Sequence, residues 1–238
     1  MRPIIGIVAR SEKNENGSSM FYVFETIRKS IINCGGEPLL LLPPQDLDYY
    51  KTRVKDYPEF TMEDEKRMLK WLNMCNGIIL PGGYKLTNFD RYVVEYCTEN
   101  DIPILGICLG MQVMSCYKKE IEIIPIEDNH LNHKQESQDG VSHRVDIKKD
   151  SLLYNILKQD SIMVNSFHTK QATYNKYYEV VAYSEDGVIE AIQNKKNTFN
   201  LGVQWHPEKN YEDDLNSLKI LNAFIEYSKN KLTDKVNS

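Results

Sequence analysis

The chain has 238 residues, of which 41% are hydrophobic and 26% are charged, and its formal net charge is −5. This length and composition predict a single domain over residues 1–238, with a core large enough for a sheet that is covered on both faces. A mildly acidic chain without a basic stripe is a poor ligand for nucleic acid or anionic membrane, so neither is an expected partner.

The spacing of the cysteines and the hydropathy of the chain bear on its location in the cell. The five cysteines are scattered and lack C-x-x-C spacing, which is typical of reduced thiols rather than of a disulfide framework. No apolar run approaches the length of a membrane span, and a strand pattern begins at once, without the pattern of a signal peptide. The expected location is therefore cytoplasmic.

The first part of the chain alternates strand and helix patterns. Buried strands are predicted at 3–9 and 38–42, with an amphipathic helix over 24–34 between them. The polar residues 10–19 are predicted to form a loop. This β-α-β opening predicts a right-handed crossover in a layered α/β fold. Residues 45–61 are expected to form a loop or short helix over the carboxyl edge of the sheet, where they could act as a lid.

The alternation continues to residue 117. The predicted elements are a helix at 62–74, a strand at 77–81, a helix at 90–99, a strand from 104, and a helix at 109–117. Paired glycines, Gly82 and Gly83, follow the strand at 77–81. Such glycines let the backbone approach a ligand and present N–H groups to it, although these residues taken alone favour a plain tight turn.

Strand patterns dominate the rest of the chain. The predicted strands are 121–126, 143–147, 162–165, 178–184, 188–193 and 200–204, with a short helical turn at 151–157. A polar, histidine-bearing loop is predicted at 127–142, a closing helix at 213–229, and a frayed polar tail from about residue 230. The whole pattern predicts a three-layer α/β fold with a mostly parallel central sheet, helices on both faces, and the site at the carboxyl ends of the strands.

The stretch 103–112 has the pattern of a nucleophile elbow. An apolar strand ends at Cys108, which lies between Gly106 and Gly110, and a helix-forming stretch follows. A cysteine at a helix N-terminus is favoured as the thiolate, and the backbone N–H of Leu109 would face an oxyanion on an attacked carbonyl. A buried structural cysteine is the alternative interpretation.

A second motif supplies what such a cysteine needs. His206 and Glu208 follow directly after the strand at 200–204. Histidine is suited to act as base and then as acid near neutral pH, and a carboxylate on its other ring nitrogen fixes its tautomer. A surface turn with an incidental histidine is the alternative, but the two motifs together are far less expected by chance than either one.

These residues resemble a known superfamily. GICLGMQ around Cys108, GVQWHPE around His206, PGG at Pro81 and VNSFH at 164–168 are similar to motifs of the class I glutamine amidotransferase-like superfamily. The resemblance covers nearly the whole chain and is closest to the γ-glutamyl hydrolase branch, that is, the peptidase C26 or γ-glutamyl-γ-aminobutyrate hydrolase-like proteins. It implies a flavodoxin-like three-layer fold and an enzyme that cleaves the amide of a small γ-glutamyl amine.

The resemblance also implies roles for individual residues. Cys108 would attack the γ-glutamyl carbonyl to give a thioester, His206 would be the general base and acid, and Glu208 would orient His206. The backbone N–H groups of Gly83 and Leu109 would form the oxyanion hole. The substrate-binding positions would be Gly82, Gln112, Ser166, Phe167 and His168. Water would then release glutamate, without any metal or organic cofactor.

Differences from the sequence pattern of this branch leave the identity of the leaving amine undecided. Many of its hydrolases carry arginine after the cysteine, whereas Leu109 resembles the amidotransferases proper. The loop at 84–89 is short, and residues 117–120 replace a glycine-rich segment. The alternative function is a glutaminase subunit that passes ammonia to a separate synthetase partner. The sequence does not decide whether the chain forms a homodimer. A redox or chaperone-like protein is a third, less favoured class of function.

Three histidines of the 127–142 loop and the following strand are candidates for metal ligands. His130, His133 and His143 lack nearby cysteines and firm ligand spacing, so no metal site is predicted. By the resemblance, His133 or His143 is instead expected to flank the substrate loop.

Overall fold

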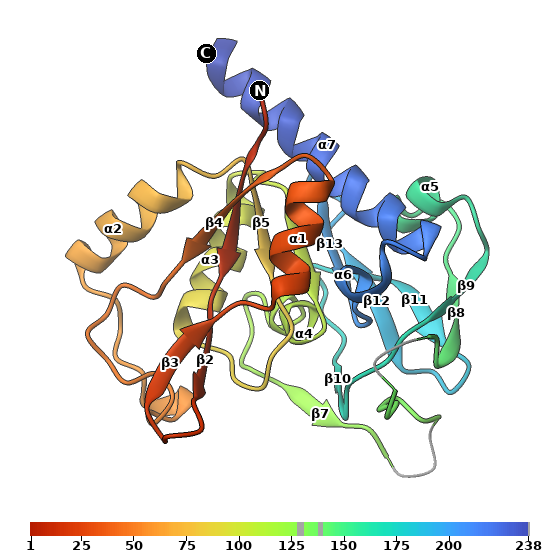
Figure 1. Cartoon of the computed structure of the whole chain (residues 1–238), viewed down its shortest axis with the longest axis horizontal. Coiled ribbons are helices and arrows are strands. Elements are labelled where there is room, and N and C mark those ends of the chain that lie inside the picture. Colours follow the sequence, from red (N-terminus) through yellow and green to blue (C-terminus); the bar gives the residue numbers. More distant parts are fainter. Residues whose placement is uncertain (128–130, 138–139, 238) are drawn as a thin grey trace.

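A nine-stranded sheet forms the centre of the protein in the computed structural model, which describes residues 1–127, 131–137 and 140–237, with side chains to residue 231 (Figure 1). The strand order is β4-β1-β5-β6-β13-β12-β11-β8-β9. Along the first half of this order, β4 (Glu37–Leu41), β1 (Ile4–Val8), β5 (Gly77–Leu80), β6 (Ile104–Ile107) and β13 (Asn200–Val203) are parallel.

The second half of the sheet is paired antiparallel. Its strands are β12 (Ile189–Gln193), β11 (Glu179–Ser184), β8 (His143–Ile147) and β9 (Ser161–Val164). Only β12 and β8 run against the common direction among the strands of this sheet in the described residues. The predicted mostly parallel sheet is confirmed.

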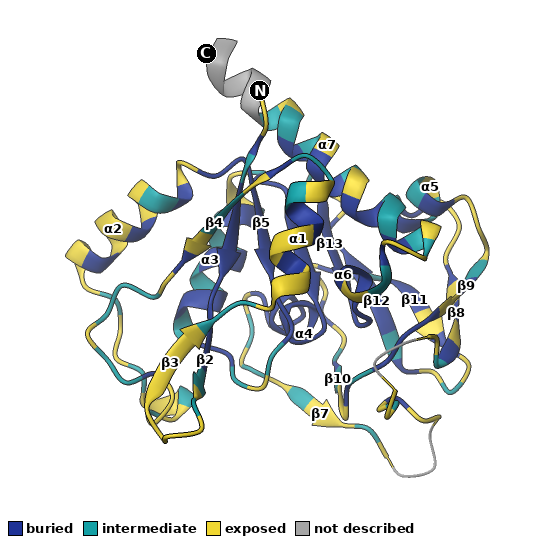
Figure 2. Cartoon of the chain, viewed as in Figure 1, coloured by how far each residue is buried: buried dark blue, intermediate teal, exposed yellow. Residues whose placement is uncertain are grey.

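Helices cover both faces of the sheet, as predicted. One face is covered by α1 (Glu25–Asn33), α5 (Leu152–Leu157), α6 (Pro207–Asn210) and α7 (Leu215–Asn237), and the other by α2 (Met62–Leu72), α3 (Asn88–Glu99) and α4 (Leu109–Met114). In β5, Ile79 joins the core on the first side, whereas Ile78 and Leu80 join the core on the second. The central strands are therefore buried on both sides (Figure 2), which explains why they read as continuous apolar runs.

Two pairings escaped the sequence analysis. The predicted polar loop at 10–19 is wrong, because β2 (Arg10–Lys13) and β3 (Ser19–Tyr22) form an antiparallel hairpin there. A short strand β10 (Lys170–Ala172), which was not predicted, pairs with β7 (Ile123–Pro125). Strands of three or four residues carry too little alternation to be recognised, and the partner of β10 lies far away in the sequence.

Element ends also differ from the expectations. The strand predicted as buried at 38–42 is the edge strand β4, where the side chain of Leu40 is 43% exposed. Helix α7 continues to Asn237, through residues expected to form a frayed tail. Residues 128–130 and 138–139 of the predicted polar loop, including His130, lie outside the described residues.

The segment 45–61 contains a single 3-10 turn, Val54–Asp56, and is tied down by its neighbours. Lys85 Nζ donates to the carbonyl of Tyr50 at 2.6 Å, and the hydroxyl of Ser19 donates to Asp48 Oδ1 at 2.9 Å. These contacts fasten the segment to the β2–β3 hairpin and to the loop that follows β5. Its action as a lid stays a prediction.

Within the described residues, no helix combines the length and the apolar character needed to cross a membrane.

Candidate active site

Cys108 lies at a strained turn between β6 and α4. Its φ of 52° and ψ of −107° are a backbone conformation that a residue with a Cβ atom rarely adopts. A Cβ atom on Gly110 would lie 2.0 Å from the carbonyl oxygen of Leu80, and one on Gly106 would lie 2.3 Å from Met114 Sδ. The two glycines of the motif are therefore required by close packing.

His206 and Glu208 come to the same end of the sheet. Strands β6 and β13 are parallel neighbours, so the residues after them emerge side by side, and the backbone N–H of Cys108 donates to the carbonyl of Val203 at 2.8 Å. His206 Nδ1 lies 2.7 Å from Glu208 Oε1. The side chain of His206 also forms a hydrogen bond with Cys108, so it lies between the thiol and the carboxylate.

The electrostatics of the trio (Cys108, His206 and Glu208) favour a positively charged imidazole. Burial alone would lower the pKa of His206, but the charges of Glu208 and Cys108 outweigh it and raise this pKa to about 10. Because Glu208 is 1% exposed, solvent screens its attraction to the imidazolium only weakly. The arrangement can therefore hold an imidazolium beside the sulfur atom at neutral pH.

Asn165 fixes the backbone of His206, a role that the sequence pattern does not indicate. Its Oδ1 accepts from the backbone N–H of His206 at 2.8 Å, and its Nδ2 donates to the carbonyl of His206 at 2.9 Å. Asn165 is separated from His206 by 41 positions, so no local pattern pointed to this contact.

Arg10 supports the turn that contains Gly82 and Gly83. Its Nε donates to the carbonyl of Pro81 at 3.1 Å and to that of Gly82 at 3.2 Å, and its Nη1 is bonded to Asp90. In a trans peptide the N–H points opposite to the C=O, so the N–H of Gly83 points away from Arg10. Gly82 itself faces the trio, because a Cβ atom there would lie 2.7 Å from His206 Cε1.

The expected substrate-binding residues separate into two groups. Gly82 and Phe167 adjoin the trio, and the ring of Phe167 lies 5.6 Å from that of His206, edge to face. Gln112 Nε2 is bonded to the carbonyl of Lys170 at 2.9 Å and to Gln204 Oε1 at 3.0 Å. The hydroxyl of Ser166 donates to the carbonyl of His133 at 2.7 Å. The side chains of Gln112 and Ser166 are therefore bonded to groups outside the trio.

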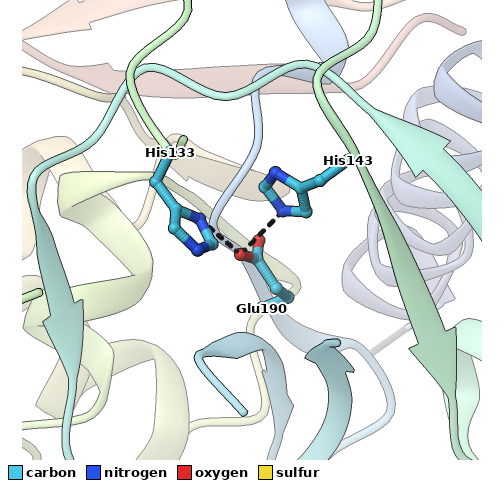
Figure 3. Close-up of side chains that lie close together, drawn as sticks. All are labelled: His133, His143 and Glu190. Atoms are coloured by element: carbon cyan, nitrogen blue, oxygen red, sulfur yellow. Dashed lines mark hydrogen bonds and ion pairs between the residues drawn. The ribbon is translucent and has the colours of Figure 1, made fainter. Parts of the chain in front are cut away.

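His168 belongs instead to a buried group of three histidines around Glu190, the histidine cluster (His133, His143, His168 and Glu190). Figure 3 shows the carboxylate of Glu190 between His133 and His143. Glu190 Oε1 lies 3.3 Å from His133 Nδ1, 3.1 Å from His143 Nε2 and 3.7 Å from His168 Nε2. The sequence pattern groups His133 and His143 with His130 and predicts no metal site for them; it does not connect them with His168, and it gives no indication of Glu190.

The histidine cluster contacts the segment 166–168, which borders the trio. The carbonyl of His133 accepts from the backbone N–H of His168 at 2.8 Å as well as from Ser166. The backbone N–H of Gln204, just before His206, donates to the carbonyl of Glu190 at 2.8 Å. Burial lowers the pKa of His168 to about 4, so this imidazole is neutral at physiological pH.

Comparisons with known proteins support a hydrolase of the glutamine amidotransferase-like class. A family model described as Peptidase C26 matches residues 3–208. The chain therefore belongs to the peptidase C26 family.

Individual proteins agree with this assignment. The chain is 31% identical to the gamma-glutamyl-gamma-aminobutyrate hydrolase PuuD of Escherichia coli over 98% of this chain and 96% of that protein. It is 33% identical to a candidate glutamine amidotransferase of Schizosaccharomyces pombe, but the match covers only 58% of this chain and 55% of the relative. The glutaminase domain of the CTPS of Trypanosoma brucei, solved with bound acivicin, has the same fold, with a TM-score of 0.62 and 17% identity over 96% of this chain and 94% of that one.

Proposed function

We propose that the chain is a cysteine hydrolase that cleaves the amide bond between the γ-carboxyl group of glutamate and a small amine. The observation that carries the proposal is the position of His206, which is bonded to Glu208 at 2.7 Å and faces Cys108 at a strained elbow. Similarity to the Escherichia coli hydrolase over nearly the full length of both chains supports a γ-glutamyl amine as the substrate.

In the proposed reaction, the Cys108 sulfur attacks the γ-carbonyl carbon of the substrate. Negative charge gathers on the carbonyl oxygen, which the N–H groups of Gly83 and Leu109 would stabilise. As the carbon–nitrogen bond breaks, the His206 imidazolium gives its proton to the leaving amine, and a thioester remains. His206 then takes a proton from water, the hydroxide attacks the thioester, and glutamate leaves as the thiolate forms again.

The binding roles of the neighbouring residues are part of the proposal. Gly82 permits the close approach of substrate to Cys108, because a side chain there would meet His206. Phe167 would border the glutamyl group beside His206. Gln112, Ser166 and His168 would contribute to the glutamyl subsite.

An alternative role is that of a glutaminase subunit that supplies ammonia to a synthetase partner. Leu109, where many hydrolases of the branch have arginine, favours it, and so does the similarity to the Schizosaccharomyces pombe protein. The chemistry at Cys108 would be the same, with ammonia as the leaving group.

The deciding experiment is a measurement of glutamate release by the purified chain. L-Glutamine and a panel of γ-glutamyl amines are offered separately, with Cys108→Ala as the control for contaminating activity. We expect rapid cleavage of at least one γ-glutamyl amine and slow cleavage of glutamine. Slow cleavage of glutamine alone would favour the glutaminase role, and no Cys108-dependent release from any substrate would contradict the proposed hydrolase.

Arg10→Met is expected to lower both stability and turnover. Asp90 would be left buried without its cation, at a cost of about 3–5 kcal/mol in the free energy of unfolding. The carbonyls of Pro81 and Gly82 would also lose their donor, and the looser turn would lower kcat about 10- to 100-fold. Urea unfolding and glutamate release measure the two effects.

A second substitution separates these effects. Asp90→Asn in the Arg10→Met background removes the uncompensated charge, so it should recover part of the stability without recovering kcat. Unchanged turnover in a folded Arg10→Met chain would show that Arg10 does not position the turn.

A further inference from the structure

We infer that the histidine cluster is a binding site for a divalent transition-metal cation of the zinc type, held by His133 Nδ1, His143 Nε2 and Glu190 Oε1, with His168 beside it. The distances carry the inference, because one ligand atom from each of these three residues lies within 4.8 Å of the others. Glu190 Oε1 lies 3.3 Å from His133 Nδ1 and 3.1 Å from His143 Nε2, and His168 Nε2 lies 3.3 Å from His133 Nδ1. Ligands at 2.0–2.1 Å in a tetrahedron are separated by about 3.4 Å.

His133 and His168 each have a hydrogen-bond acceptor on the ring nitrogen that faces away from Glu190. Each therefore keeps a lone pair on the nitrogen that faces the cluster. His133 Nε2 lies 3.1 Å from Asp186 Oδ2, and a hydrogen atom on Nε2 leaves the lone pair on Nδ1, which faces Glu190. His168 Nδ1 lies 3.0 Å from the carbonyl of Lys170, an acceptor only, so the hydrogen is on Nδ1 and the lone pair on Nε2. Histidines that bind metals are oriented in the same way by carboxylates and carbonyls.

Burial and charge favour a cation at this position. Glu190 is 0% exposed, and its Oε2 has no hydrogen-bond partner among the described residues. A buried polar atom without a partner costs about 1–3 kcal/mol, and a cation bound at Oε1 would offset this cost by neutralising the carboxylate. Glu190 and Asp186, which both lie against His133, together carry two negative charges, and these match the charge of a dication. Imidazole donors suit zinc and its neighbours rather than magnesium or calcium.

The bound cation would join separate parts of the chain next to the proposed active site. Its ligands come from the loop before β8, from the start of β8 and from β12, and His168 beside them lies in the segment after Asn165. Asn165 in turn holds the backbone of His206. The cation would therefore act as a structural tie and would take no part in the chemistry at Cys108.

The first test uses the full chain after treatment with a chelator. Zn²⁺ is added in a calorimetric titration, and the melting temperature is followed with and without Zn²⁺. We expect one equivalent to bind with a dissociation constant of about 1 μM or tighter and to raise the melting temperature. Co²⁺ should give the strong visible absorption of a tetrahedral site. No binding, or the weak absorption of octahedral Co²⁺, would overturn the inference.

Variants locate the cation. His143→Gln keeps a donor toward Glu190 but removes an imidazole ligand, and it should abolish the shift in melting temperature. Asp186→Asn changes only an outer partner and should weaken Zn²⁺ binding about 10- to 100-fold. His206→Asn, which alters the other buried histidine–glutamate pair, is the matched control and should bind Zn²⁺ like the unmodified chain. Unchanged binding in His143→Gln, or loss of binding in His206→Asn, would contradict the assignment.

Discussion

Replacing Cys108 by alanine is expected to lower kcat for glutamate release by about 10⁴-fold or more and to leave the chain folded. The substitution removes the sulfur atom that forms a hydrogen bond with His206. It keeps the Cβ atom and leaves the packing of Gly106 and Gly110 unaltered. Kinetics on the best substrate of the panel, together with circular dichroism, measure the two parts of this expectation.

Cys108→Gly is the control for the backbone at the elbow. Because residue 108 has a φ of 52°, glycine should relieve strain that alanine retains, and it should raise the free energy of unfolding by about 1 kcal/mol relative to Cys108→Ala. Both variants should be inactive. Glutamate release that survives in either one would mean that another group performs the attack.

Glu208→Gln is expected to lower kcat by about 10²- to 10⁴-fold, because the imidazole loses the charge that orients it and favours its protonated form. The carboxylate is buried, with Oε1 2.7 Å from His206 Nδ1, so water cannot readily replace it. Glu208→Asp keeps the charge on a shorter side chain and should recover part of the activity. Equal activity of the glutamine variant and the unmodified chain would remove Glu208 from the proposed mechanism.

The same substitution should change the pH dependence of stability. In the folded chain His206 has a pKa of about 10, whereas an unfolded histidine releases its proton near pH 6.5. Between these values the folded state binds more protons, so the contribution of His206 is complete below about pH 6.5 and is lost as the pH rises toward 10. Glu208→Gln lowers the pKa of His206 and should flatten this decline.

Urea unfolding of both chains from about pH 6 to 10 tests the sign of this effect. The unmodified chain should lose more stability across the interval than Glu208→Gln does. Parallel curves for the two chains would show that Glu208 is not the charge that holds the proton on His206.

Local patterns were sufficient where the chemistry depends on neighbours in the chain. Gly106, Cys108 and Gly110 lie within five consecutive positions, and the collision that excludes side chains at the glycines arises wherever a strand turns sharply into a helix. His206 and Glu208 are two residues apart, so their contact could be foreseen as well. The central strands were recognised because burial on both faces demands unbroken apolar runs.

Long-range contacts were out of reach of the same reasoning. Arg10 was predicted to belong to a polar loop, yet it is 1% exposed and bonded to a turn 71 residues away. The short strand β10 and the edge position of β4 depend on which strands become neighbours, and sequence patterns do not encode this order. Helix α7 extends to Asn237, beyond the expected end near residue 229, because polar residues can continue a helix in solvent.

The sequence by itself therefore determined the layered fold and the candidate trio, since both follow from periodicity and from residues close together in the chain. Only the tertiary structure decided what surrounds them. Asn165 reaches His206 across 41 positions, and the histidine cluster joins residues from 133 to 190 around one carboxylate. The physical reason is that the free energy of a buried polar contact depends on the distance between its atoms and on the exclusion of solvent in the folded chain. Local sequence determines neither of these quantities.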